Sequence, residues 1–163
     1  MAANPPPDLA LVPITGRTRS VRELLTTFHL LFVAVDPSNV RSRWIVPTAA
    51  RVLTEYEQAD CRVAWLVAGD AADARKFLGR WATDITTFAD PDLTAVRAFG
   101  LGTLPAIVHL GMDGTVVNAV EGWDPPAWSA LTSELSRRMQ WSKPHIPVAA
   151  DPGPFHGAPL PRI

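Results

Sequence analysis

Continuous apolar runs alternate along the chain with segments in which apolar residues recur every three or four positions, and this pattern predicts strands interleaved with helices. Apolar runs with few polar breaks are typical of strands covered on both faces of a sheet. The predicted strands cover residues 29–35, 61–68, 85–88 and 105–110. The predicted helices cover residues 20–27, 39–58, 70–81, 90–99 and 124–139. The alternation indicates an α/β protein with parallel crossovers between strands.

Several predicted helices begin at a residue that can cap them. Ser20 stands three positions before Glu23, the spacing of a capping box, in which each side chain accepts a hydrogen bond from the other residue's amide. Asp70, Asp90 and Asp124 precede three later helical segments, and aspartate is a favoured N-cap residue. These polar positions support the predicted helix starts.

The strand that begins at Pro105 leads into a predicted hairpin. Asp113-Gly114 separates this apolar run from a second one that starts at Thr115. An Asp-Gly pair between apolar runs is a strong hairpin signal, because both central residues of a type I′ turn need positive φ. We therefore expect a type I′ turn at these two residues.

Length and composition indicate one domain. The chain has 163 residues, 47% of them hydrophobic, and six tryptophans, which is enough for one substantial core. Residues 1–12 are proline-rich and are expected to be flexible, residues 13–141 to form the domain, and residues 142–163 to form a proline-rich tail with Phe155 as its main apolar residue. The tail is expected to be irregular and extended.

Charge and hydropathy exclude some partners. The net charge is −1 with acidic and basic residues interspersed, so no basic patch indicates nucleic acid or a lipid surface. The start of the chain lacks the features of a secretory signal, and no apolar run approaches the length of a membrane span. We therefore predict a cytoplasmic protein.

Two stretches resemble a known family. The strand from Pro105 with its Asp113-Gly114 hairpin is similar to the cis-proline strand and hairpin of thioredoxin-like proteins, particularly the TlpA/ResA oxidoreductases and the related AhpC/TSA peroxiredoxins. The buried strand 29–35, the helix that follows it, and Pro47 five residues beyond Ser42 resemble the family's active-site segment. The resemblance spans roughly residues 14–140 and implies a central mixed sheet flanked by helices, with a cis bond before Pro105.

The family's Cys-x-x-C motif is absent. Its four positions read Asn39-Val40-Arg41-Ser42, and Cys61 is the only cysteine. Dithiol exchange needs an attacking and a resolving thiol, so neither thiol-disulfide oxidoreductase nor peroxiredoxin activity is expected, and we name no catalytic residue. We expect Cys61 to be a small buried hydrophobe, with a regulatory role as the alternative.

No cofactor or metal is expected. No two of the four histidines stand at ligand spacing, and one cysteine does not make a thiolate site. Asn39 and Ser42 stand at a helix start that favours anions, but a nucleophilic Ser42 would need an adjacent base.

The resemblance implies a groove between the loop before Pro105 and the vacated helix start. In the family this loop offers backbone groups to an extended peptide, so a peptide could bind here by strand addition. The residues expected to contact a partner are Asp36, Arg41, Trp44, Thr103, Leu104 and Pro105.

Three functions remain open from the sequence. The leading hypothesis is a redox-inactive, chaperone-like binding or assembly module for a protein or peptide. The second is an enzyme without a dithiol, or a small-thiol-binding protein, that uses Asn39–Ser42 or Cys61. The third is a structural subunit of a larger oligomer, with the tail clipped onto a neighbour; a homo-oligomer is compatible with all three.

Overall fold

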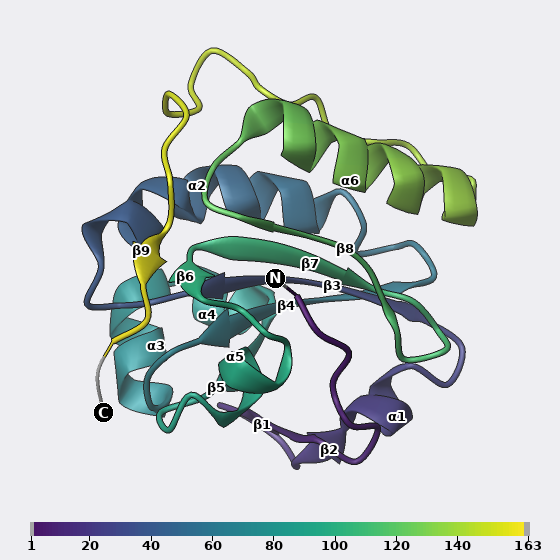
Figure 1. Cartoon of the computed structure of the whole chain (residues 1–163), viewed down its shortest axis with the longest axis vertical. Coiled ribbons are helices and arrows are strands. Elements are labelled where there is room, and N and C mark those ends of the chain that lie inside the picture. The colour runs from purple at the N-terminus through teal and green to yellow at the C-terminus, as the bar shows by residue number, and fades with distance from the viewer. Residues whose placement is uncertain (1, 162–163) are drawn as a thin grey trace.

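The structure is a computed structural model that describes residues 2–161; Met1, Arg162 and Ile163, from the N-terminal segment and the tail, lie outside the described residues. Seven strands form a central sheet in the order β2-β1-β5-β4-β3-β7-β8, whose arrangement can be followed in Figure 1. The strands are β1 (Ala10–Pro13), β2 (Arg19–Ser20), β3 (His29–Val35), β4 (Cys61–Val67), β5 (Thr86–Ala89), β7 (Ala106–Leu110) and β8 (Val116–Glu121). A separate two-stranded sheet joins β6 (Thr103–Leu104) to β9 (Ala158–Pro159).

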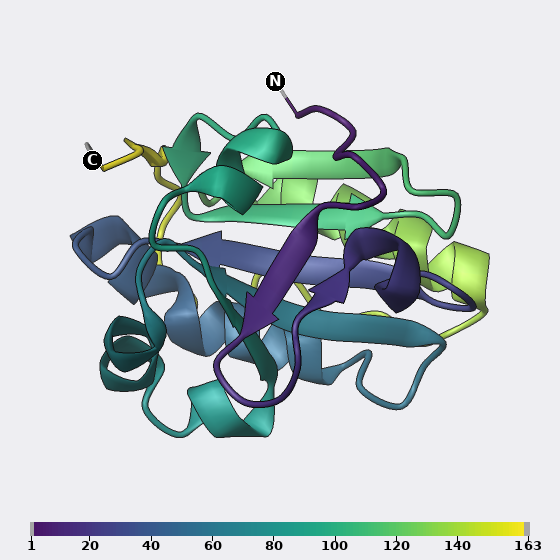
Figure 2. The same ribbon diagram turned by 90° about the horizontal axis from the view of Figure 1, so that it is seen from below.

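Helices cover both faces of the sheet. They are α1 (Val21–Leu24), α2 (Val40–Thr54), α3 (Ala71–Leu78), α4 (Trp81–Asp84), α5 (Thr94–Ala98) and α6 (Pro125–Met139). α2 and α6 lie on one face, and α1 and α5 on the other, which faces the viewer in Figure 2. β3 runs parallel to β4 and antiparallel to β7, so the sheet is mixed, as the resemblance implies.

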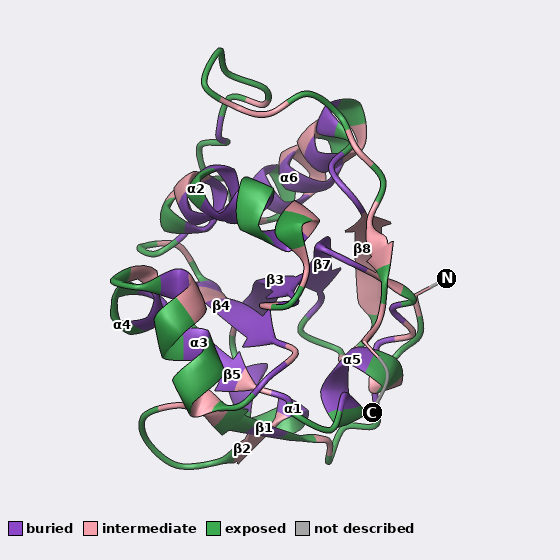
Figure 3. Ribbon diagram, turned by 90° about the vertical axis from the view of Figure 1, so that its left-hand side faces the viewer, coloured by how far each residue is buried: buried purple, intermediate pink, exposed green. Residues whose placement is uncertain are grey.

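The core has one layer on each side of the sheet. Under α2 and α6 it contains Trp65, Trp123 and Trp128, each at most 1% exposed. The opposite layer contains Phe32 and Phe99, whose rings lie 4.7 Å apart. Figure 3 shows β3, β4 and β7 as almost continuously buried. A strand covered on both faces has no exposed side for polar residues, which explains the unbroken apolar runs in the sequence.

The predicted helix starts are largely correct. The capping boxes at Ser20 and Asp70 are both formed, and the Asp124 side chain accepts a hydrogen bond from the amide of Ala127. Asp90 acts differently, because α5 begins only after Leu93; its carboxylate reaches over the loop to the amides of Ala95 and Val96. Asp90 therefore still accepts hydrogen bonds from amides at the start of the expected helix, although it lies about one turn before α5.

The hairpin turn differs from the prediction. Gly114 has a φ of +85°, but Asp113 does not have a positive φ. The amide of Gly114 donates to the carbonyl of Gly111, and the amide of Gly111 donates to the carbonyl of Thr115. This is a longer loop around a type I turn, with glycine in the left-handed position, rather than a type I′ turn. Asp-Gly fits both, because only the glycine needs positive φ in the longer loop.

The N-terminal segment is attached to the domain, contrary to the flexible residues 1–12 predicted from its prolines. β1 pairs with β2 and with β5 at the edge of the sheet. Farther out, the amide of Ala3 donates to the carbonyl of Phe99, and Asn4 accepts from the amide of Val116. The three prolines at positions 5–7 precede β1, so they remove no amide from its ladders with β2 and β5. The domain thus begins before residue 13.

Candidate functional site

The start of α2 and the loop of β6 lie side by side at one end of the sheet. The side-chain amide of Asn39 donates to the carbonyl of Leu104 at 3.4 Å, and the Leu104–Pro105 bond is cis. The structure therefore brings together the two segments that the sequence analysis placed opposite each other. β3 positions the first segment, because the chain leaves its buried carboxyl end directly into the turn before α2.

Asn39 and Ser42, at the two positions predicted to correspond to the family's cysteines, use their polar side chains to hold the backbone. Asn39 caps α2 by accepting from the amide of Arg41 at 2.8 Å. Ser42 is fully buried, and its hydroxyl accepts from the amide of Asp36 at 3.0 Å. Within residues 2–161, this hydroxyl has no recorded hydrogen bond to a basic side chain, so nothing in the described chain activates it as a nucleophile.

Three of the predicted contact residues, Asp36, Leu104 and Pro105, are buried and do not offer side chains to a partner. Asp36 is 3% exposed, and its carboxylate accepts from the amide and hydroxyl of Ser38. Leu104 is fully buried in the core layer with Phe99. The three predictions are corrected for the same reason: the turn before α2 and the loop of β6 fold these side chains inward. Only the backbone of Leu104 faces the groove, through the β6 ladder.

The C-terminal tail of the same chain fills the groove. β9 pairs antiparallel with β6, so that Thr103 lies opposite Pro159 and Leu104 opposite Ala158. The guanidinium of Arg41 donates to the carbonyl of His156 at 3.2 Å and to that of Gly157 at 3.3 Å. Figure 1 shows this yellow segment descending past the start of α2 to β6. Strand addition therefore occurs here within one chain.

Phe155 marks the centre of the docked tail. Its amide and carbonyl both bond to the backbone of Trp123, at 3.0 and 2.8 Å. Its ring meets the ring of Trp44 edge-on, with centroids 5.5 Å apart. Trp44, which the sequence analysis assigned to the groove, is half-exposed and lies at its outer wall. The indole of Trp123 adds a hydrogen bond to the carbonyl of Pro152.

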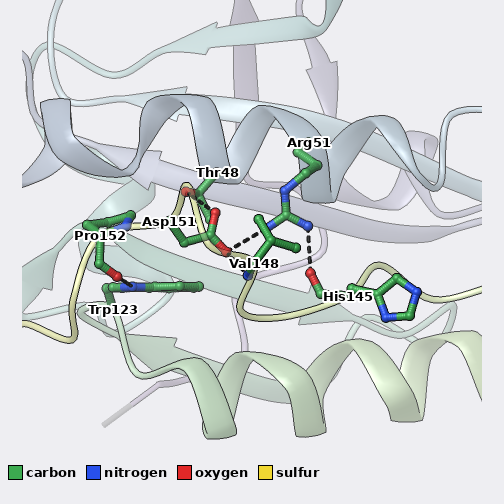
Figure 4. A network of polar contacts seen from close by, with 7 residues as sticks. All are labelled: Thr48, Arg51, Trp123, His145, Val148, Asp151 and Pro152. Carbon is green, nitrogen blue, oxygen red and sulfur yellow. Dashed lines mark hydrogen bonds and ion pairs between the residues drawn. The ribbon is translucent and has the colours of Figure 1, made fainter.

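A polar network tethers the tail just before this point. The buried carboxylate of Asp151 accepts from the hydroxyl of Thr48 at 2.8 Å, from Arg51 at 2.7 Å and from the amide of Val148 (Figure 4). Arg51 also donates to the carbonyl of His145. Burial alone would raise the pKa of Asp151, but these hydrogen bonds outweigh it and lower the pKa. The network fixes the approach of the tail along α2.

Cys61 lies at the far end of the sheet. It begins β4 opposite His29, whereas the groove lies beyond the other end of β3. The thiol is 5% exposed, and burial raises its pKa to about 12. A thiol that is neutral and covered is a poor nucleophile, which agrees with the buried hydrophobe expected from the sequence.

We expect Cys61 to resist alkylation in the folded protein. The raised pKa lowers the thiolate fraction about 10³-fold near neutral pH, and burial slows access further. Labelling with iodoacetamide at about pH 8 should therefore be limited by unfolding, and the same chain in concentrated urea serves as the control. Rapid modification in native buffer would support the regulatory alternative.

The arrangement of strands and helices is the thioredoxin-like fold, without the Cys-x-x-C motif. Neither a protein-family model nor a curated protein matches the sequence. Among solved structures, the chain is similar to a secreted Mycobacterium tuberculosis disulfide oxidoreductase homologous to E. coli DsbE, with 17% identity, 82% of this chain and 95% of that chain covered, and a TM-score of 0.59. It is also similar to peroxiredoxin Q of Xanthomonas campestris, with 15% identity, 80% and 89% covered, and a TM-score of 0.63.

A third solved structure extends the likeness. The hypothetical protein SMc02350 from Sinorhizobium meliloti 1021 is 11% identical, with 98% of this chain and 93% of that chain covered and a TM-score of 0.70. A coverage of 98% includes most of the tail. At these identities the likeness shows the fold alone. Among residues 2–161, no helix combines the length and hydropathy needed to cross a bilayer.

Proposed function

We propose that this chain is a redox-inactive, thioredoxin-like binding or assembly module that recognises an extended segment of a protein or peptide partner at the groove between α2 and β6. The observation that carries the proposal is how the groove holds the tail. Each recorded hydrogen bond from Arg41, Trp123 and β6 to residues 152–159 goes to a backbone atom of the tail. A groove that binds backbone atoms is suited to other extended segments.

The other hypotheses have less support. The tail lies over the helix start at Asn39–Ser42, and the side chains there already hold the backbone, which leaves the small-thiol hypothesis without an observation in its favour. Cys61 is buried away from the groove. The tail docks on its own chain, so these contacts do not require the neighbour that the structural-subunit hypothesis needs. The cytoplasmic location stays a prediction from the sequence.

The tail makes the groove testable with a defined ligand. We expect a fluorescent peptide with the sequence of residues 150–161 to bind the full chain carrying Phe155→Asp, because a charge beside Trp44 should displace the tethered tail. With an effective concentration of about 1 mM for the tail and a Kd of about 10 µM for the free peptide, the wild-type chain should bind about 100-fold more weakly. Fluorescence polarisation measures both.

Two controls make the result decisive. Arg41→Ala, added to Phe155→Asp, should weaken peptide binding, since it removes the donor to two carbonyls, whereas the neighbouring exposed Arg43→Ala should not. Circular dichroism must show both chains folded. Absence of binding by the folded Phe155→Asp chain would refute the proposal. Leu104 is unsuitable for such a test, because a charge at this buried position would disrupt the core.

A further inference from the structure

The docked tail also shows which side chains the groove selects. We infer that the groove prefers partner segments with an aromatic residue, then any residue, then glycine, the pattern of Phe155-His156-Gly157; this inference rests on the proposed function. Three observations carry it, one for each position. They concern the space at Gly157, the ring contact of Phe155 and the exposure of His156.

The first observation is that no side chain fits at position 157. A Cβ built on Gly157 would lie 2.7 Å from the hydroxyl oxygen and 2.9 Å from the Cβ of Thr103, closer than real Cβ atoms approach. Thr103 has little freedom to move aside, because its amide and hydroxyl both donate to the Glu121 carboxylate, at 2.6 and 3.1 Å. The φ of Gly157 is not in the left-handed region, so the requirement is for space and not for backbone conformation.

Gly122, on the opposite wall of the groove, is also in close contact with residues 155–157 of the tail. Gly122, with a φ of +81°, lies so close to the tail that its own Cβ would be 2.8 Å from the amide nitrogen of Gly157 and 2.9 Å from the carbonyl oxygen of Phe155. The tail therefore passes between Thr103 and Gly122 with no room to shift sideways. Relief of a Cβ at position 157 would need the ladder with β6 to open.

The second observation is the aromatic contact. Phe155 packs edge-on against Trp44 and against the core layer under α2 and α6. Its backbone is bonded in both directions to Trp123, which fixes its register relative to Gly157. Edge-to-face ring pairs add stabilisation beyond the buried area. An aromatic side chain two residues before the glycine is thus the one that this wall accommodates.

The third observation is that position 156 is open. The side chain of His156 is exposed, and the recorded contact of this residue with the groove is the hydrogen bond from Arg41 to its carbonyl. A carbonyl is common to every residue, so the groove does not discriminate here. Position 156 therefore provides a matched control within the same peptide.

We propose to measure four peptides against the full chain carrying Phe155→Asp. The peptide with the sequence of residues 150–161 is the reference, and the others carry Gly157→Ala, Phe155→Ala or His156→Ala. Gly157→Ala and Phe155→Ala should each weaken binding by about tenfold or more, and His156→Ala by less than about twofold. If Phe155→Asp does not fold, the full chain carrying Gly157→Val is the receptor, because its added methyl groups displace the tail by the same contact with Thr103.

A rescue separates selection by space from general loss of affinity. Thr103→Gly in the receptor removes the hydroxyl oxygen and the Cβ, the two atoms that a Cβ at position 157 would meet within 3.0 Å, and leaves the amide nitrogen of Leu104, at 3.2 Å, as the nearest. It should therefore restore most of the binding of the Gly157→Ala peptide and leave the Phe155→Ala peptide weak. Equal affinity for all four peptides would overturn the inference while leaving the proposed function standing. Failure of the reference peptide to bind either folded receptor would overturn both.

Discussion

Replacing both Asn39 and Ser42 with cysteine is expected to create a working dithiol in this chain. The two residues stand at the N-cap and the third position of α2, opposite the backbone of Leu104, and the resemblance predicts that these are the positions of the Cys-x-x-C motif. Backbone amides at a helix start lower the pKa of a thiol there. The dithiol, kept reduced by dithiothreitol, should reduce insulin disulfides and itself become oxidised, well above the rate with the wild-type chain.

The single variants and the tail provide the comparison. Asn39→Cys alone has no resolving thiol, so it should form mixed disulfides with glutathione but no intramolecular bond. Ser42→Cys alone should be slow to react, because this side chain is fully buried. Adding Phe155→Asp to the double variant should raise the reduction rate further, because the tail covers the helix start. If mass spectrometry shows no intramolecular disulfide, the vacated positions do not retain the geometry of the motif.

The fold could be predicted because its signals are local. Apolar runs, the capping boxes at Ser20 and Asp70 and the strand from Pro105 each depend on residues close in sequence, and the structure agrees with them. The position of Asn39 opposite Leu104 followed from the resemblance. What local signals leave undetermined is the exact turn, as at Asp113-Gly114, where two loop types accept the same pair.

The occupied groove could not be predicted in the same way. The tail contacts join residues far apart in the sequence, up to the 116 positions between Arg41 and Gly157, and many of them use backbone carbonyls that every residue has. A proline-rich sequence indicates an extended chain but not where it docks. The sequence did contain one sign of a docked strand: Phe155 and Gly157 stand two positions apart, the spacing of residues on one face of a strand, and prolines lie on both sides of them. This sign could not be interpreted from the sequence, because the requirement for glycine at position 157 comes from the close approach of Thr103 and Gly122 to the tail.

His29 and His109 lie next to each other in the core, and the strand pattern, although not the spacing of the two residues along the sequence, indicates this. His29 is in phase with the inward Leu31 and Val33 of β3, and His109 is in phase with Ile107 of β7. Both imidazoles therefore point under α6, where Nδ1 of His29 lies 2.9 Å from Nε2 of His109. The alternation of the strands predicts that both face the same layer, although no metal spacing is present.

The pair should make folding stability depend on pH. Burial, followed by the charges of His29 and Arg138, lowers the pKa of His109 to about 4, and burial also lowers the pKa of His29. In the unfolded chain both titrate near the ordinary value of about 6.5. Between these limits the unfolded chain binds more protons, so the free energy of unfolding falls as the pH falls from about 6.5 to about 4 and is at its full value above this window.

The size of the loss of unfolding free energy, together with two substitutions, tests whether His109 causes it. A shift of this extent at His109 corresponds to on the order of 3 kcal/mol of stability lost by about pH 4.

Urea unfolding should be compared across this window for the wild type, His109→Leu and the exposed control His145→Ala. His109→Leu should flatten the pH dependence, since Nδ1 of His109 has no hydrogen-bond partner within residues 2–161 and an apolar side chain removes its titration. His145→Ala should retain the wild-type slope. Equal slopes for all three chains would mean that carboxylates with lowered pKa values, such as Asp151 and Glu134, account for the acid sensitivity instead.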